Sequence, residues 1–292
     1  MFKGIKTIYG LSEIIDKYDV FILDQWGVMH NGKNGYKHAI DCVEKIFNKK
    51  NKIIIISNSS VRKKITIERL PKLGFDPIFF NEVMTSGEMV WRYLKDKNDS
   101  FIKKLNNCYF IYDETKKYSQ DFILGLNNYN FVKNLEDADF ILGTSVNSKL
   151  KTIDFLPILI EALKKNIPFI CGNPDYETLD YKNNENCICM GTVAELYKIM
   201  GGKIYILGKP KVEIYEESTK VLKSVNKTRI LAIGDSIYHD IKGANSFGID
   251  SLLVTSGIHK SIFKKEDESN FFFNELINNN AKPTYLCKNF QF

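Results

Sequence analysis

The 292-residue sequence has few of the residues that mark disulfide-bonded, zinc-binding or membrane proteins. It contains six Cys and four His, and its one C-x-C, Cys187-Ile188-Cys189, has no second pair at zinc-binding spacing. No segment approaches the roughly 20 apolar residues of a membrane span, and residues 1–10 have no long apolar stretch after a basic start. We therefore expect a soluble, cytoplasmic protein with reduced thiols and no membrane partner.

The charge excess is small and has no dense basic block. Lys and Arg number 41 against 35 Asp and Glu, which gives a formal net charge of +6 and a pI near 8.8. Because the lysines are scattered among Asp, Glu and Asn, we expect a mildly basic surface and no nucleic-acid partner. Hydrophobic residues make up 44%, which is enough for a real core in one large domain or two ordinary ones.

Four short apolar runs each lead into one polar side chain. The pairs are 21–23 with Asp24, 53–56 with Ser57, 204–207 with Lys209, and 230–233 with Asp235. Continuous apolar runs are typical of buried parallel strands, and ligands bind beyond the carboxyl ends of such strands. The two carboxylates, the hydroxyl and the ammonium should therefore converge at one end of one sheet. Carboxylates that can hold Mg2+, beside a Lys and a Ser that can hold phosphate, indicate a phosphoryl-transfer site.

Strand and helix patterns alternate along the chain and predict an α/β fold with a parallel sheet. Strands are expected at 18–24 and 52–57, with an amphipathic helix through Tyr36 and Phe47 between them and another over 61–70. From about residue 83 the alternation restarts. The expected strands there are 109–112, 139–142 and 168–171, and the expected helices are 87–95, 152–165 and 192–200. A capping box from Thr192 to Glu195 is expected to open the last helix.

The first pattern is expected to resume after residue 203. Strands at 204–207, 229–233 and 250–254, with a helix at about 211–224, would complete the first sheet. The predicted division is a core domain built from 1–82 and 204–292, with a second domain, 83–203, inserted between its halves.

The segments at the strand ends resemble the four motifs of the haloacid dehalogenase (HAD) superfamily. They are Asp24-Gln25-Trp26-Gly27-Val28, Ser57-Asn58-Ser59, Gly208-Lys209-Pro210, and the stretch from Gly234 to Ile241. Thr85-Ser86-Gly87-Glu88 and Gly172-Asn173-Pro174-Asp175 are similar to class IIA members, which carry an α/β cap between the second and third motifs. This resemblance covers nearly the whole chain and implies a Rossmann-like, parallel-sheet HAD core with an inserted α/β cap domain.

The resemblance also implies a role for each motif residue. Asp24 would be the nucleophile that attacks phosphorus and becomes an aspartyl-phosphate. Lys209 would neutralise phosphate oxygens and fix Asp24, and Ser57 and Asn58 would lie in the loop that binds the phosphoryl group. For Ser57 taken alone, capping of a turn is the alternative interpretation.

A metal ion and a substrate loop follow from the same resemblance. Mg2+ would be held by Asp24, the Trp26 carbonyl, Asp235 and Asp240, with helix capping as the alternative role of Asp240. In the inserted domain, Asn173 and Asp175 would face the substrate, unless Asn173-Pro174-Asp175 is only a turn. Class IIA relatives are often dimers through the cap, so a homodimer is also suggested.

One motif position departs from the family pattern. Two residues after the nucleophile, HAD phosphatases usually carry a second Asp that protonates the leaving oxygen and later activates water; here that residue is Trp26. An indole exchanges no proton near neutral pH, and loss of general acid–base help costs about 100- to 10,000-fold in rate. P-type ATPases carry Thr there, phosphonate hydrolases Ala, and the Mg2+-independent dehalogenases Tyr. A class IIA subgroup carries Asp-x-Trp-Gly-Val, as this chain does.

Three interpretations remain open. The first is a Mg2+-dependent phosphatase for a small phosphorylated metabolite. Such an enzyme would be slow, would act on substrates with a good leaving group, or would use His30 or His239 as a substitute acid. The second is a phosphotransferase, and the third is a non-catalytic phosphometabolite-binding protein. The retained nucleophile and metal ligands favour the first two, while Asp235 and Asp240 argue against a dehalogenase. The sequence leaves the class of substrate open.

Overall fold

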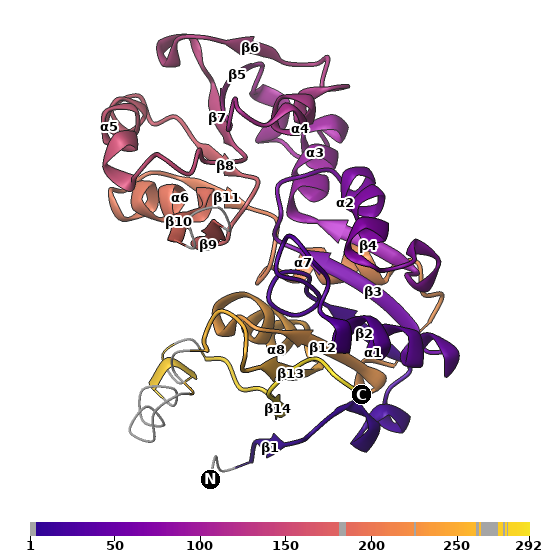
Figure 1. Cartoon of the computed structure of the whole chain (residues 1–292). Coiled ribbons are helices and arrows are strands. Elements are labelled where there is room, and N and C mark those ends of the chain that lie inside the picture. The colour runs from indigo at the N-terminus through magenta and orange to yellow at the C-terminus, as the bar shows by residue number, and fades with distance from the viewer. Residues whose placement is uncertain are drawn as a thin grey trace. The chain divides into compact units, whose positions relative to one another are not determined.

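The computed structural model describes residues 4–180, 185–224, 226–260, 263, 274–276, 278 and 280–292. The chain forms two compact units, each of which contains a parallel sheet (Figure 1). The core unit consists of Met1–Ser57, Thr66–Met84 and Lys209–Phe292. The inserted unit consists of Asn58–Ile65 and Thr85–Gly208.

Among the described residues, the core unit has a seven-stranded sheet in the order β1-β14-β13-β12-β2-β3-β4. Its strands are β1 (Lys6–Thr7), β2 (Val20–Leu23), β3 (Lys52–Ser57), β4 (Glu82–Thr85), β12 (Ile230–Gly234), β13 (Asp250–Val254) and β14 (Tyr285–Cys287). Neighbouring strands from β1 to β3 pair in parallel. The strands predicted at 18–24, 52–57, 229–233 and 250–254 are confirmed.

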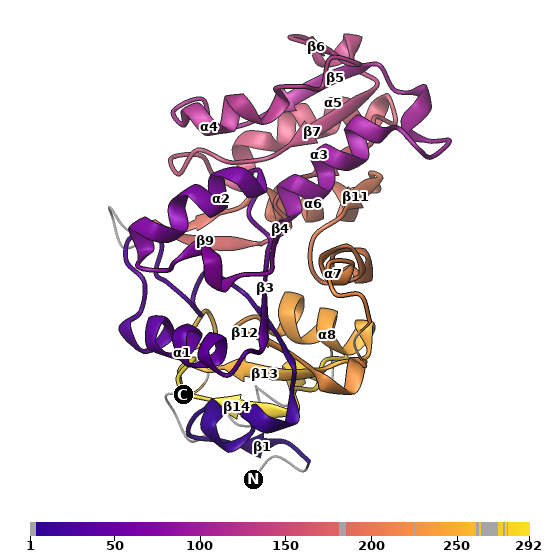
Figure 2. The same cartoon turned by 90° about the vertical axis from the view of Figure 1, so that its right-hand side faces the viewer.

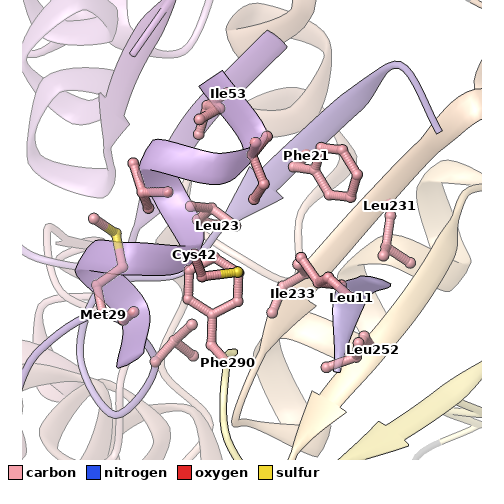
Figure 3. Packing of buried hydrophobic residues seen from close by; sticks show 14 of the residues in the cluster. Leu11, Phe21, Leu23, Met29, Cys42, Ile53, Leu231, Ile233, Leu252 and Phe290 are labelled. Atoms are coloured by element: carbon pink, nitrogen blue, oxygen red, sulfur yellow. The ribbon is translucent and has the colours of Figure 1, made fainter. Parts of the chain in front are cut away.

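Helices cover both faces of this sheet, which is why its strands are apolar on both sides. Helix α1 (Lys37–Asn48) lies on one face, and α7 (Val212–Thr219) and α8 (Lys242–Phe247) lie on the other (Figure 2). Figure 3 shows how Cys42 of α1 packs with Leu23, Ile233 and Phe290. Each large side chain that such packing buries fully contributes about 1.5–3 kcal/mol, so the core holds the strand ends in place.

The inserted unit has its own parallel sheet in the order β11-β8-β7-β5-β6. Its strands are β5 (Asn107–Ile111), β6 (Asn130–Val132), β7 (Phe140–Gly143), β8 (Phe169–Cys171) and β11 (Ile204–Ile206). Its helices are α3 (Ser86–Asp96), α4 (Lys117–Gln120), α5 (Leu156–Lys164) and α6 (Met190–Ile199), while α2 (Lys63–Arg69) crosses the boundary between the units. Strands β9 (Glu177–Asp180) and β10 (Glu185–Ile188) form an antiparallel pair.

Two predicted elements were wrong in detail. The run 204–207 does not resume the first sheet, because β11 pairs with β8 and belongs to the inserted unit. An apolar run predicts a buried strand but does not say which sheet contains it. Helix α6 begins at Met190 with Cys189 as its N-cap, so no capping box at Thr192 opens it. The Thr192 hydroxyl instead donates to the Tyr176 carbonyl.

Candidate active site

Three carboxylates converge at the carboxyl edge of the core sheet. Asp24 directly follows β2, and Asp235 directly follows the neighbouring strand β12. Asp240 lies in a single π-helical turn, η10 (Ile237–Ile241), just after β12. One carboxylate oxygen from each of the three residues lies within 4.8 Å of the others.

Lys209 joins two of these carboxylates. Its Nζ donates to Asp24 Oδ1 at 2.5 Å and to Asp240 Oδ1 at 2.6 Å, and its side chain is only 3% exposed. Burial by itself lowers the pKa of the Lys209 ammonium, but Asp24 and Asp240 raise it well above its ordinary value. The ammonium therefore keeps its charge and its protons at any physiological pH.

One ammonium does not balance three carboxylates. Burial raises the pKa of the Asp235 carboxyl well above its ordinary value, and repulsion from Asp24 and Asp240 raises it further. The Ile258 N–H, which donates to Asp235 Oδ2 at 2.8 Å, acts against this shift. A buried group of hard oxygen donors with excess negative charge fits a small divalent cation such as Mg2+.

Three positions close to these carboxylates are glycines, because a side chain there would clash with the carboxylates. A Cβ built on Gly27, whose φ is +80°, would lie 2.0 Å from Asp235 Oδ2, and one on Gly257 would lie 2.1 Å from the same atom. A Cβ on Gly234 would lie 2.1 Å from the Asp240 Cγ. Sequence reasoning assigned no role to Gly257 or to the Ile258 N–H, because a backbone contact leaves no side-chain signal. The available signal was the sequence Thr255-Ser256-Gly257, which directly follows β13 (Asp250–Val254).

Trp26 is 39% exposed as a residue, and its ring meets the His30 ring edge-on at a centroid distance of 5.7 Å. Burial, assisted by Arg69, lowers the pKa of His30 to about 4. His30 Nδ1 accepts a hydrogen bond from the Gly32 N–H at 2.9 Å, which also requires a neutral ring. His239 is buried, with its Nδ1 3.2 Å from Ser236 Oγ. Near pH 7, His30 is therefore an uncharged imidazole.

The remaining predicted residues lie in two places. Ser57 ends β3, beside β2, and is buried in the core unit. Asn58 is buried in the inserted unit, where its Nδ2 donates to Asp175 Oδ1 at 2.9 Å. Asn173 Oδ1 accepts from the Asp175 N–H at 3.1 Å within the same loop. The structure thus brings Asp24, Lys209, Asp235 and Asp240 together and separately pairs Asn58 with Asp175.

Family comparisons match both ends of the chain. A family of haloacid dehalogenase-like hydrolases matches residues 21–140, and a second family of HAD-like hydrolases matches residues 206–291. Both matched regions contain residues of the carboxylate site. The chain belongs to the haloacid dehalogenase-like hydrolases. A comparison with curated proteins finds no match for this hydrolase.

Solved structures resemble this hydrolase over nearly its full length. A haloacid dehalogenase-like hydrolase from Brucella suis superposes with a TM-score of 0.80 at 27% identity, covering 96% of this chain and 98% of that one. A possible sugar phosphatase from Cytophaga hutchinsonii gives 0.76 at 17% identity, covering 98% and 99%. A p-nitrophenyl phosphatase from Archaeoglobus fulgidus gives 0.68 at 19% identity, covering 94% and 97%. The last two show the shared fold alone, and the predicted Rossmann-like HAD fold is confirmed. No helix in the described part of this hydrolase has the length and apolar character to cross a bilayer.

Proposed function

We propose that this HAD-like hydrolase is a Mg2+-dependent phosphatase for a small phosphorylated metabolite. The observation that carries the proposal is the contact of the buried, protonated Lys209 with Asp24, beside the further carboxylates of Asp235 and Asp240. Two solved proteins of the same fold are named as phosphatases, which supports the same class of reaction here. The Asp-x-Trp-Gly-Val subgroup, the division into domains at 83 and 203, the homodimer and the cytoplasmic location stay predictions.

Asp24 is the proposed nucleophile. One of its carboxylate oxygens attacks phosphorus while the bond from phosphorus to the leaving oxygen breaks, and that oxygen departs with the electron pair and takes up a proton from solvent. Water then attacks the aspartyl-phosphate, which releases inorganic phosphate and restores the carboxylate. Lys209 orients Asp24 through their ion pair and offers positive charge to the phosphoryl oxygens.

The metal site fits the same chemistry. Asp24, Asp235, Asp240 and the Trp26 carbonyl would hold Mg2+, which when bound offsets the repulsion between the phosphate and the Asp24 carboxylate. Ser57 and Asn58 would bind phosphoryl oxygens. Asn173 and Asp175 are retained as candidate substrate-loop residues.

Trp26 favours phosphoryl transfer as the second candidate function. Because an indole cannot activate water, an aspartyl-phosphate at Asp24 would persist longer than in an enzyme with Asp at this position. An alcohol or another phosphate acceptor would then compete with water. Addition of glycerol during turnover tests this candidate, because transfer would release p-nitrophenol faster than inorganic phosphate.

The first test is release of p-nitrophenol from p-nitrophenyl phosphate by the wild-type protein and Asp24→Asn. We expect turnover that requires Mg2+, stops with EDTA and is lost in Asp24→Asn. This leaving group departs with little protonation, so the assay bypasses the missing general acid. Asp41→Asn, an exposed site on α1, is the matched control and should retain activity. Equal rates in the wild type and Asp24→Asn would exclude the hydrolase mechanism and favour a phosphometabolite-binding protein.

A further inference from the structure

Asp175 lies in a loop whose backbone is fixed at both ends. The loop follows β8, and the Asp175 carbonyl accepts from the Gly191 N–H of α6 at 3.1 Å. A Cβ built on Gly191 would lie 2.4 Å from the Asp175 oxygen, so the helix and the loop touch without room for a side chain. These contacts hold the Asp175 backbone against the start of α6.

The Asp175 side chain forms a hydrogen bond with Asn58. Its Oδ1 accepts from Asn58 Nδ2 at 2.9 Å, and the Asn58 residue is 2% exposed. A hydrogen bond to a charged acceptor contributes about 1.5–3 kcal/mol, more than one between neutral groups. This hydrogen bond therefore contributes to the orientation of the Asn58 amide.

Asn58 stands where the chain passes from one unit to the other. Ser57 is the last residue of a core-unit segment, and Asn58 is the first residue of an inserted-unit segment. The last return crossing into the core unit has the same form, with Gly208 in the inserted unit and Lys209 in the core unit. The first and last of the four crossings thus each fall between a residue of the inserted unit and a proposed phosphate-binding residue.

The loop that contains Asp175 also packs against the return crossing. A Cβ on Gly208 would lie 2.6 Å from Asn58 Oδ1 and 2.8 Å from Pro174 Cγ. Because Gly208 has no side chain, Asn58 and Pro174 approach its backbone closely. Residues next to Ser57 and Lys209 are therefore held against one loop of the inserted unit.

We propose that Asp175 is a positioning residue that holds Asn58, and through it the loop after Ser57, in the orientation that receives a phosphoryl group. This inference rests on the proposed function. It assigns Asp175 to the phosphate loop through Asn58, so its removal should affect every phosphate ester alike. A residue that contacts the organic part of a substrate would instead affect some esters much more than others.

A double-mutant cycle with Asn58→Ala and Asp175→Ala tests the link. In p-nitrophenyl phosphate and phenyl phosphate hydrolysis, we expect each single variant to lose about tenfold in kcat/KM and the double variant to lose no more than one of them. The inhibition constant of inorganic phosphate should rise by the same factor. Asp175→Asn keeps an acceptor oxygen and should restore most of the loss, and Asp154→Ala, at an exposed site of the inserted unit, should behave as the wild type. Additive losses, or losses that differ between the two esters, would overturn the proposal.

Hydrogen–deuterium exchange tests whether Asp175 stabilises the loop after Ser57, independently of turnover. Peptides that cover Asn58–Val61 should exchange faster in Asp175→Ala than in the wild type, and Asp154→Ala should leave them unchanged. Unchanged exchange in Asp175→Ala would overturn the inference even in an active enzyme. If the wild type shows no turnover, the proposed function is overturned. Faster exchange in Asp175→Ala would then still show that Asp175 stabilises the loop after Ser57.

Discussion

In the proposed mechanism, Trp26 stands two residues after the nucleophile, where the family resemblance leads us to expect a general acid. Its side chain is partly exposed, and the neighbouring His30 ring is neutral because burial lowers its pKa to about 4. Neither group supplies a proton near neutral pH. The rate should therefore depend strongly on the leaving group.

Replacement of Trp26 by Asp should restore the missing proton transfer. We expect Trp26→Asp to raise kcat for phenyl phosphate by about 100-fold and to raise it much less for p-nitrophenyl phosphate, whose leaving group needs little protonation. Steady-state rates with both esters measure this. Trp26→Phe, which has no titratable group, serves as the control and should show no gain. Equal gains with both esters would mean that a process other than proton transfer limits the rate.

Among the elements, the π-helical turn η10 places Asp240 most directly. The Asp240 and Ile241 N–H groups both donate to the Ser236 carbonyl, at 2.9 and 3.1 Å, and Asp240 Oδ2 accepts from the Ser236 N–H at 3.0 Å. Ile237 is the first residue of the turn, and no carbonyl within the turn precedes it to accept its N–H. This N–H instead donates to His259 Nε2 at 3.1 Å. His259 thus supports the first residue of the turn only while its ring is neutral.

Acid should therefore destabilise this turn. Burial lowers the folded-state pKa of His259 from 6.5 to about 4. As the pH falls from about 6.5 towards 4, the unfolded chain binds a proton that the folded protein does not, so the free energy of unfolding falls. The contribution lost between pH 7 and pH 5 is about 2 kcal/mol. His259→Gln keeps an acceptor for Ile237 but does not titrate, and urea unfolding at the two pH values should show a correspondingly smaller loss in this variant. An equal loss in both proteins would contradict the assignment to His259.

The sequence predicted elements best where several apolar residues follow one another. The run 53–56 predicted a strand at 52–57, and β3 is Lys52–Ser57. Strands of two or three residues, such as β1 and β6, have too few residues for a periodic pattern. The start of α6 at Met190 depends on packing against the Asp175 loop, which local capping preferences do not reveal.

The same limit applies to the candidate site. Asp24 and Asp235 could be placed together because each follows a buried run and their strands are neighbours. Lys209 follows β11, which belongs to the other sheet, so its proximity to Asp24 was expected for a wrong reason. The Ile258 N–H and the Asn58–Asp175 pair depend on tertiary contacts between distant segments, and no local pattern contains them.

For the whole molecule, the excess negative charge at the carboxylate site should make stability depend on Mg2+. A ligand that binds only the folded state stabilises it by about 2.7 kcal/mol at 100 times its dissociation constant. We expect Mg2+ to raise the melting temperature by several degrees at constant ionic strength, as measured by scanning calorimetry. Asp235→Asn should melt higher than the wild type without Mg2+, because it removes a like charge, and should gain little when Mg2+ is added.

Asp41→Asn, which removes an exposed carboxylate of the core unit, is the matched control and should keep the full Mg2+ response. A full response in Asp235→Asn would place the cation elsewhere in the protein.

The order of strands in the core sheet bears on how the chain folds as it is synthesised. Strand β2 pairs with β12 in the centre of the sheet, and β1 at the edge pairs with β14, near the opposite end of the chain. During translation, the edge of β2 that pairs with β12 therefore has no partner until residues 230–234 have left the ribosome. All five strands of the other sheet lie between Asn107 and Ile206, so that sheet can assemble first. Nascent chains stalled before residue 230 should therefore leave this edge of β2 unpaired, and it is the segment for a chaperone to protect.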